Sequence, residues 1–137
     1  LKVHQYTMLC APRVAQHAAI AALAGGFQDD FASVGQMRAE YDKRRRFLVK
    51  SFNDLGLTCF EPRGAFYAFP SVEATGLTGE EFVERLLKEE QVAVVPGNAF
   101  GECGDYHVRC SYATGMRELQ EAVARIARFT EKLRKNR

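Results

Sequence analysis

The sequence predicts an α/β domain of the α+β sandwich type, in which helices pack on a small mixed sheet and long helices lead into the domain. Two observations favour this class. Segments with helical and with strand character follow one another in the order helix, helix, strand, strand, helix, strand, strand, helix. The chain has 137 residues, 47% of them hydrophobic and 26% charged, which is ordinary for a chain with one core.

Two helices are expected before the first strand. Residues 12–24 are rich in alanine, and Gly25 and Gly26 are suited to end that helix. Residues 29–55 carry apolar side chains every three or four positions, with Gly56 as a plausible stop. At ~1.5 Å per residue the second helix would span about 40 Å, more than the diameter of about 26 Å of a 100-residue domain. We therefore expect it to bridge this domain and a neighbour.

The other elements alternate between strands and helices. The expected strands are residues 57–60, 65–69, 92–95 and 106–112, and the expected helices are residues 79–90 and 115–134. The first two strands should form a pair through a turn at residues 62–64 (Pro-Arg-Gly). Thr78 and Glu81 have the spacing of a capping box, which predicts that a helix starts directly after Thr78.

The charge balance gives little reason to expect a nucleic acid partner. Lys and Arg number 19 against 17 for Asp and Glu, so the net charge is only +2. The basic run at residues 43–46 has Glu40 and Asp42 beside it, which favours a solvated helix face. No apolar run approaches the ~18 residues of a membrane helix, and residues 1–10 lack the features of a signal peptide. We expect a cytoplasmic protein with no membrane partner.

The cysteines are expected to be reduced thiols. Cys10, Cys59, Cys103 and Cys110 include no C-x-x-C pair, and the chain is not dense in cysteine. A metal site built from Cys103, His107 and Cys110 is the alternative. The spacing C-x3-H-x2-C is unusual for zinc and no fourth ligand is evident, so we expect no metal.

Residues 107–112 contain the most informative side chain. Strand alternation places His107, Arg109 and Ser111 on one face of the sheet and the residues between them on the other. An arginine in such a strand either forms an ion pair with a carboxylate of the protein or binds a ligand carboxylate through two parallel hydrogen bonds. The residues alone leave both interpretations of Arg109 open.

The glycines before this strand do not form a phosphate-binding motif. Gly97, Gly101 and Gly104 give the pattern G-x3-G-x2-G, which is neither a dinucleotide fingerprint nor a P-loop, and no lysine follows. For Asn98 and Phe100, which lie between them, loop structure is an adequate explanation.

Three segments carry a resemblance to a known family. The stretch VAVVPGNAFGECGDYHVRCSYA (92–113), followed by a helix that contains RIARF, resembles the C-terminal part of class I and II aminotransferases, which are pyridoxal-phosphate enzymes of fold type I. PRVAQHAAIAAL (12–23) resembles the helix that follows the cofactor lysine, and EPRGAFYAFP (61–70) resembles the strand with the G-x-F-Y pattern. The resemblance extends over nearly the whole chain.

The resemblance implies roles for two residues. Arg109, the arginine of V-R-x-S-Y-A, would grip the α-carboxylate of the substrate. Phe66, the aromatic residue of the G-x-F-Y strand, would lie near the substrate side chain, with core packing as the alternative. Arg13 and Arg63 are possible second cations for an acidic substrate, although surface positions explain both.

The resemblance also implies the organisation of the protein. Residues 1–28 would be the end of the large domain with an interdomain helix, and residues 29–137 the small C-terminal domain. The chain begins at Leu1 without Met and would be about the last third of an aminotransferase. The lysine that forms a Schiff base with the cofactor in an S-x-x-K-like motif would lie upstream, because no lysine here has that context.

The complete protein is expected to be a homodimer that transfers an amino group between an amino acid and a 2-oxo acid, in the manner of aspartate aminotransferase. It would use pyridoxal 5′-phosphate, whereas this chain alone is expected to bind no cofactor and to be inactive. Two alternatives remain open. One is a standalone interaction or amino-acid-binding module without enzymatic activity. The other is part of a pyridoxal-phosphate-dependent carbon–sulfur lyase or synthase, which these residues do not separate from a transaminase.

Overall fold

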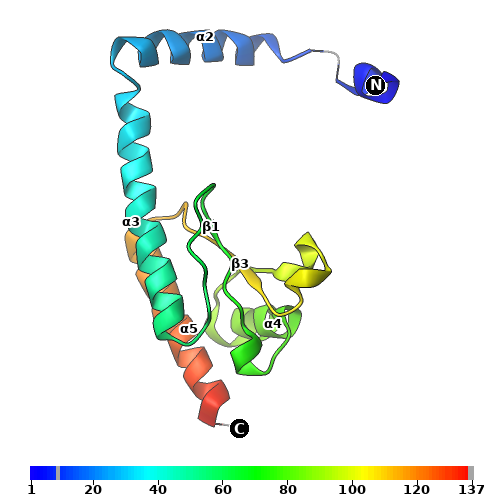
Figure 1. Ribbon diagram of the computed structural model, residues 1–137, viewed down its shortest axis with the longest axis vertical. Coiled ribbons are helices and arrows are strands. Elements are labelled where there is room, and N and C mark those ends of the chain that lie inside the picture. Colours follow the sequence, from blue (N-terminus) through cyan, green and yellow to red (C-terminus); the bar gives the residue numbers. More distant parts are fainter. Residues whose placement is uncertain (9, 136–137) are drawn as a thin grey trace. The chain divides into compact units, whose positions relative to one another are not determined.

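The computed structural model describes residues 1–8 and 10–135 (Figure 1). The helices are α1 (Lys2–Thr7), α2 (Arg13–Gln28), α3 (Ala32–Asp54), α4 (Gly79–Glu90) and α5 (Met116–Lys135), with short 3-10 helices η1 (Glu73–Thr75), η2 (Gly97–Phe100) and η3 (Glu102–Gly104). The strands are β1 (Tyr67–Ala68), β2 (Val95–Pro96) and β3 (Val108–Ser111). The chain divides into two compact units, Leu1–Ala39 and Glu40–Arg137, with the boundary inside α3.

The first unit is helical, and one of its predicted boundaries is wrong. We expected α2 to end at Gly25 and Gly26, but it continues to Gln28. The ring of Phe31 lies over Gly26, 2.3 Å from the position that a Cβ atom there would take. The Phe31 N–H donates a hydrogen bond of 2.8 Å to the Gly26 carbonyl, so the glycine lies inside the last turn.

The second unit contains the sheet and the core. The sheet has the order β1-β3-β2, and both pairings are antiparallel. Tyr67 pairs with Ser111 and Val95 pairs with Arg109, which makes β3 the central strand. This arrangement of helices on a small sheet confirms the predicted fold class, but the sheet is antiparallel in both of these pairings and not mixed as expected.

The expected strand at residues 57–60 is absent, and so is its pairing with residues 65–69. The Asn53 side chain instead bonds both backbone groups of Cys59: its amide nitrogen donates to the carbonyl (3.0 Å) and its oxygen accepts from the N–H (3.1 Å). These bonds satisfy polar groups that a strand would have paired in a ladder. The second predicted strand survives as β1, and its partner is β3.

The predicted start of α4 is confirmed. The Thr78 hydroxyl accepts a hydrogen bond from the Glu81 N–H, and the Glu81 carboxylate accepts one from the Thr78 N–H, which completes the capping box. The helix ends at Gln91, a non-glycine residue with φ of 55°. Its inner face places Phe82 against Phe129 of α5, with ring centroids 5.2 Å apart in an edge-to-face arrangement.

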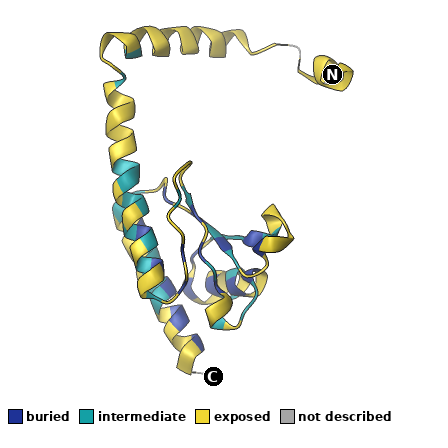
Figure 2. Ribbon diagram, in the orientation of Figure 1, coloured by how far each residue is buried: buried dark blue, intermediate teal, exposed yellow. Residues whose placement is uncertain are grey.

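Among the residues that the structure describes, buried side chains are confined to the second unit (Figure 2). The largest fully buried ones are Phe52, Phe82, Phe129, Leu57 and Leu86, contributed by α3, α4, α5 and the segment after α3. They cover one face of the sheet and leave the other face for a site. In the described part of the chain, no helix has the length and apolar character needed to cross a membrane.

Candidate functional site

The two faces of β3 differ as the alternation predicted. Val108 and Cys110 are buried in the core, whereas Arg109 is half-buried and Ser111 is exposed on the opposite face. Burial raises the pKa of the Cys110 thiol to about 12. The face that carries Arg109 is therefore the one available to a ligand.

Two aromatic rings contact the guanidinium of Arg109. Its Cζ atom lies 4.3 Å from the ring centroid of Tyr67 and 4.3 Å from that of Phe100. Tyr67 belongs to β1, on the same face as Arg109, and Phe100 is the last residue of η2, which directly follows β2. Both distances lie within the ~6 Å over which a cation is attracted to the face of a ring.

Arg109 has no carboxylate partner among the described residues. The ion pairs of the second unit involve other arginines and lysines, such as Arg45 with Asp42 and Arg128 with Glu90. The first interpretation of this arginine, an ion pair with a carboxylate of the protein, is therefore not supported by residues 1–8 and 10–135. The guanidinium keeps its hydrogen-bond donors available for a ligand carboxylate.

A second aromatic pair lies beside this arginine. The ring of Phe69 stacks on His107, with centroids 5.2 Å apart and planes 9° apart, and meets Phe100 edge-on at 6.3 Å. The Nδ1 atom of His107 is buried and has no hydrogen-bond partner in the part of the chain that the structure describes. The face therefore combines one cation with an apolar aromatic border.

Phe66 lies at the edge of this cluster. Its ring centroid is 4.7 Å from that of Tyr67 and 6.0 Å from that of Tyr41, and 37% of the residue is exposed. Phe66 thus contacts Tyr67, which in turn contacts the guanidinium of Arg109. Arg13 and Arg63, the possible second cations, are both exposed.

Sequence reasoning missed Tyr67 and attributed Phe100 to loop structure. Their role depends on which strands are neighbours, because β1 and β2 flank β3 only in the folded sheet. The strand at residues 65–69 was expected, but with a different partner. The correct pairing would have placed Tyr67 diagonally opposite Arg109, within reach of a long side chain.

The glycines of the preceding loop have a steric role. A Cβ atom on Gly97 would lie 2.4 Å from the Gly104 carbonyl oxygen, and one on Gly104 would lie 2.2 Å from the Gly97 carbonyl oxygen. The two backbones are in direct contact, so neither position has space for a side chain. This contact brings the ends of the loop together, and Phe100 lies between them.

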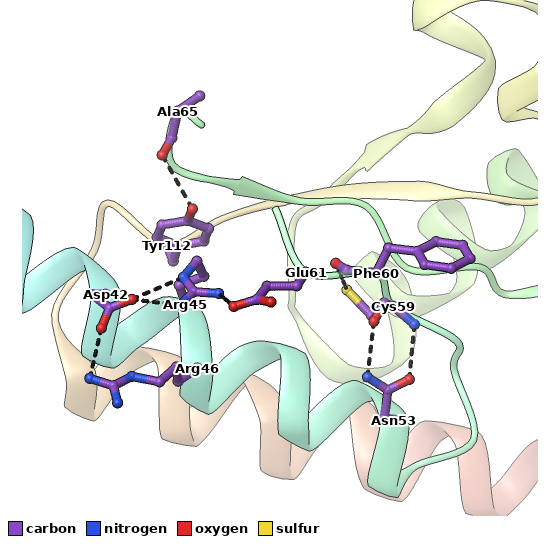
Figure 3. A network of polar contacts seen from close by, with 9 residues as sticks. All are labelled: Asp42, Arg45, Arg46, Asn53, Cys59, Phe60, Glu61, Ala65 and Tyr112. Carbon is purple, nitrogen blue, oxygen red and sulfur yellow. Dashed lines mark hydrogen bonds and ion pairs between the residues drawn. The ribbon is translucent and has the colours of Figure 1, made fainter. Parts of the chain in front are cut away.

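The basic run at residues 43–46 is engaged in ion pairs. Asp42 accepts hydrogen bonds from Arg45 (2.6 Å) and pairs with Arg46 (2.7 Å), and Arg45 also reaches Glu61 (Figure 3). The Arg45 guanidinium holds the pKa of the Asp42 carboxyl below its ordinary value. Glu40 and Asp42, the neighbours used in the prediction, together with Glu61 offset most of the positive charge of the run.

The cysteines do not gather around a metal. All four are free; Cys59 and Cys110 are buried, and Cys10 and Cys103 are exposed. His107 and Cys110 point to opposite faces of the sheet, which separates the suggested ligands Cys103, His107 and Cys110. Within the described residues no group of three or more His, Cys, Asp or Glu side chains could hold a metal ion.

The lysines lie in ion pairs or are exposed. Each of them except Lys2 pairs with a carboxylate: Lys43 with Glu40, Lys50 with Asp54, Lys88 with Glu84, Lys132 with Glu90 and Lys135 with Glu131. Lys2 is exposed in α1. A lysine that attacks a carbonyl is activated by a lowered pKa in an apolar or cationic setting, which none of these ion pairs provides.

A groove of about 550 Å³ lies elsewhere in the second unit, beside α5. Its lining includes Val92, Arg117, Glu121 and Arg125 and none of the aromatic residues around Arg109. Arg125 pairs with Glu121, and Arg117 pairs with Glu118. With its charged groups engaged with one another, this groove is a weaker candidate than the face of the sheet.

Comparison with known proteins identifies the class. Residues 2–126 match the family described as "Aminotransferase class I and II". Because the match extends over most of the chain, the protein belongs to the class I and II aminotransferase family. The predicted resemblance is confirmed.

Individual relatives agree with this assignment. A putative aminotransferase of Bacillus subtilis is 50% identical over 132 residues, which are 96% of this chain and 33% of that protein. An aspartate aminotransferase of Pyrococcus abyssi is 44% identical over 126 residues, 92% of this chain and 32% of that protein. The chain thus spans about a third of the length of the curated relatives it matches.

Solved structures show the same fold. The aromatic aminotransferase of Pyrococcus horikoshii superposes with a TM-score of 0.87 at 44% identity, over 96% of this chain and 34% of that one. The aspartate aminotransferase of Thermotoga maritima gives a TM-score of 0.77 at 37% identity, over 95% of this chain and 32% of that one.

Proposed function

We propose that the complete protein is a pyridoxal-phosphate-dependent aminotransferase, and that this chain supplies the arginine that binds the α-carboxylate of its substrates. The observation that carries the proposal is the state of Arg109. Its guanidinium lies against two rings on the ligand-accessible face of the sheet and has no carboxylate partner among the described residues. Membership of the family and the names of the relatives support the reaction class.

Arg109 would bind both substrates of the reaction. An amino acid and a 2-oxo acid share the α-carboxylate and differ at the α-carbon, so one guanidinium can hold either through two parallel N–H···O bonds. Arg109 then orients the α-carbon and carries no proton itself. Phe66, at the edge of the aromatic cluster, would contact the substrate side chain.

The cofactor site would be built by other parts of the complete protein. Pyridoxal phosphate supplies an electron sink and a carbonyl that exchanges the amino group. The residues of this chain do not fit it on their own, because its lysines are paired with carboxylates or exposed. The chain alone would therefore be inactive.

The organisation of the complete protein is part of the proposal. Residues 1–28 would belong to the end of the large domain and an interdomain helix, and residues 29–137 to the small domain. The complete protein would be a cytoplasmic homodimer. Reading the gene upstream of the Leu1 codon tests this: a continuous frame with an S-x-x-K-like lysine supports it, and a stop codon directly upstream contradicts it.

The Arg109→Ala variant of the complete protein tests the role of the arginine. Loss of two charge-assisted hydrogen bonds should lower kcat/KM by about 10²-fold or more with amino acid donors such as aspartate and phenylalanine. Arg117→Ala, at an exposed position of α5, is the matched control and should leave kcat/KM unchanged. Unchanged kcat and KM in Arg109→Ala would contradict the proposal.

The same assay separates transamination from elimination. A transaminase forms a new amino acid from an added 2-oxo acid. A carbon–sulfur lyase needs no added 2-oxo acid and releases ammonia and a sulfur compound. Amino transfer to 2-oxoglutarate is the expected outcome.

A further inference from the structure

We infer that Phe100, together with Tyr67, is a positioning residue that fixes the plane of the Arg109 guanidinium for an incoming carboxylate. The inference rests on the proposed function, because it concerns the same arginine. It gives Phe100 a function, whereas the sequence analysis explains this residue by loop structure alone.

The two rings reach the guanidinium from opposite sides of the central strand. Tyr67 lies on β1 and Phe100 on the turn that follows β2, and these strands flank β3 on its two edges. Both ring centroids are 4.3 Å from the Cζ atom of Arg109. A cation at this distance from two rings is held on two sides, so the arginine side chain loses much of its rotational freedom before any substrate binds.

This placement suits carboxylate binding because of the shape of a guanidinium. Its N–H donors all point outward in one plane, whereas its two faces are weakly hydrated and stack on aromatic rings. Rings that engage the faces leave the edge donors free for two parallel bonds to a carboxylate. A guanidinium that is already held in place loses less conformational entropy on binding than one that must be immobilised.

The position of Phe100 is not explained by core packing. The residue is 51% exposed, and its other ring contact is the edge-on approach to Phe69 at 6.3 Å. The loop that carries it is closed by the backbone contact between Gly97 and Gly104, independently of the Phe100 side chain. Removal of the ring should therefore leave the loop and the fold in place.

The experiment compares Phe100→Leu, Phe100→Tyr and Phe60→Leu in the complete protein, with aspartate or phenylalanine as donor and 2-oxoglutarate as acceptor. Phe60→Leu is the matched control, since Phe60 is 83% exposed in the same unit. Phe100→Leu should raise the KM for donor and acceptor alike by about tenfold, with kcat changed by less than about twofold. Phe100→Tyr should restore both KM values, and Phe60→Leu should change neither.

Other outcomes separate this inference from the proposed function. Unchanged KM values in Phe100→Leu, when Arg109→Ala lowers kcat/KM, would overturn the inference and leave the proposed function intact. If Arg109→Ala also has no effect, both fail. A fall in Tm for Phe100→Leu as large as that of a core variant, without rescue by Phe100→Tyr, would show a structural role and overturn the inference.

Discussion

Residues 1–39 and residues 40–137 are both rich in helix, but the buried core formed by the described residues lies in the second unit. Among the described residues of the first unit, Gly26 and Phe31 are partly buried and the others are exposed. The exposed ones include the large apolar residues Val14, Ile20, Leu23 and Phe27 of α2. In the second, apolar residues from α3, α4, α5 and the sheet are buried together. Within this chain, the described helices of the first unit bury no side chain, whereas those of the second unit are supported by packing into a common core.

The largest expected effect is a difference between two matched leucines. Leu86 is fully buried in α4 and Leu23 is 52% exposed in α2. Leu86→Ala should lower the free energy of unfolding by about 2–5 kcal/mol, whereas Leu23→Ala should change it by less than about 0.5 kcal/mol. Denaturant unfolding of this chain measures both. Equal losses would show that α2 is packed after all.

A smaller effect is expected from the two glycines of α2. A Cβ atom on Gly25 would meet no other atom within 4 Å, so Gly25→Ala should stabilise the helix by about 0.5–1 kcal/mol. Gly26→Ala is the matched control, because its Cβ would overlap the Phe31 ring and cancel this gain. Helical content measured by circular dichroism should rise in the first variant only. A rise in both would contradict the role of Phe31.

The smallest expected effect on stability comes from an ion pair between two helices of the second unit. The described residues of the first unit form no ion pair between helices. Glu90 of α4 is buried and accepts hydrogen bonds from Lys132 (2.6 Å) and Arg128 (3.0 Å) of α5. These cations hold the pKa of the Glu90 carboxyl below its ordinary value of 4.5. A lowered pKa in the folded state adds stability above the ordinary pKa, and this stability is lost as the pH falls through the folded value.

Glu90→Gln should therefore be less stable than the parent chain at pH 7, and the difference should shrink below about pH 4. Thermal unfolding between pH 3 and pH 7 measures it. Glu84→Gln is the control, since Glu84 and Lys88 form a pair within α4 in which both side chains are about 70% exposed. An equal and pH-independent loss in the two variants would show that the contact between helices adds nothing.

The parts of the fold that depend on neighbours in the sequence were predictable. The capping box of Thr78 and Glu81 fixed the start of α4, and the alternation in β3 placed Arg109 opposite the core. Strand pairing was not predictable in the same way. Residues 57–60 have strand character, but Asn53 satisfies the backbone of Cys59 and leaves β1 to pair with β3.

The candidate site shows the same division. The carboxylate-binding role proposed for Arg109 follows from its residue type, its strand and the family resemblance. The contacts of its guanidinium with Tyr67 and Phe100 depend on three segments that meet only in the folded chain. Phe31 over Gly26 is a further example, because a glycine pair alone does not reveal that a ring will lie over it.

The contact between Gly97 and Gly104 has a consequence for altering the loop beside Arg109. These two positions are sterically closed, whereas Ala99, Glu102 and Cys103 between them are exposed. Phe100 contacts the Arg109 guanidinium, and Gly101 has a φ of 133° that disfavours other residues, so the positions open to variation in this loop are 99, 102 and 103. Random libraries directed at these three positions, with Phe100 and the three glycines kept, would vary the border of the candidate binding face without disturbing the strands that carry Arg109.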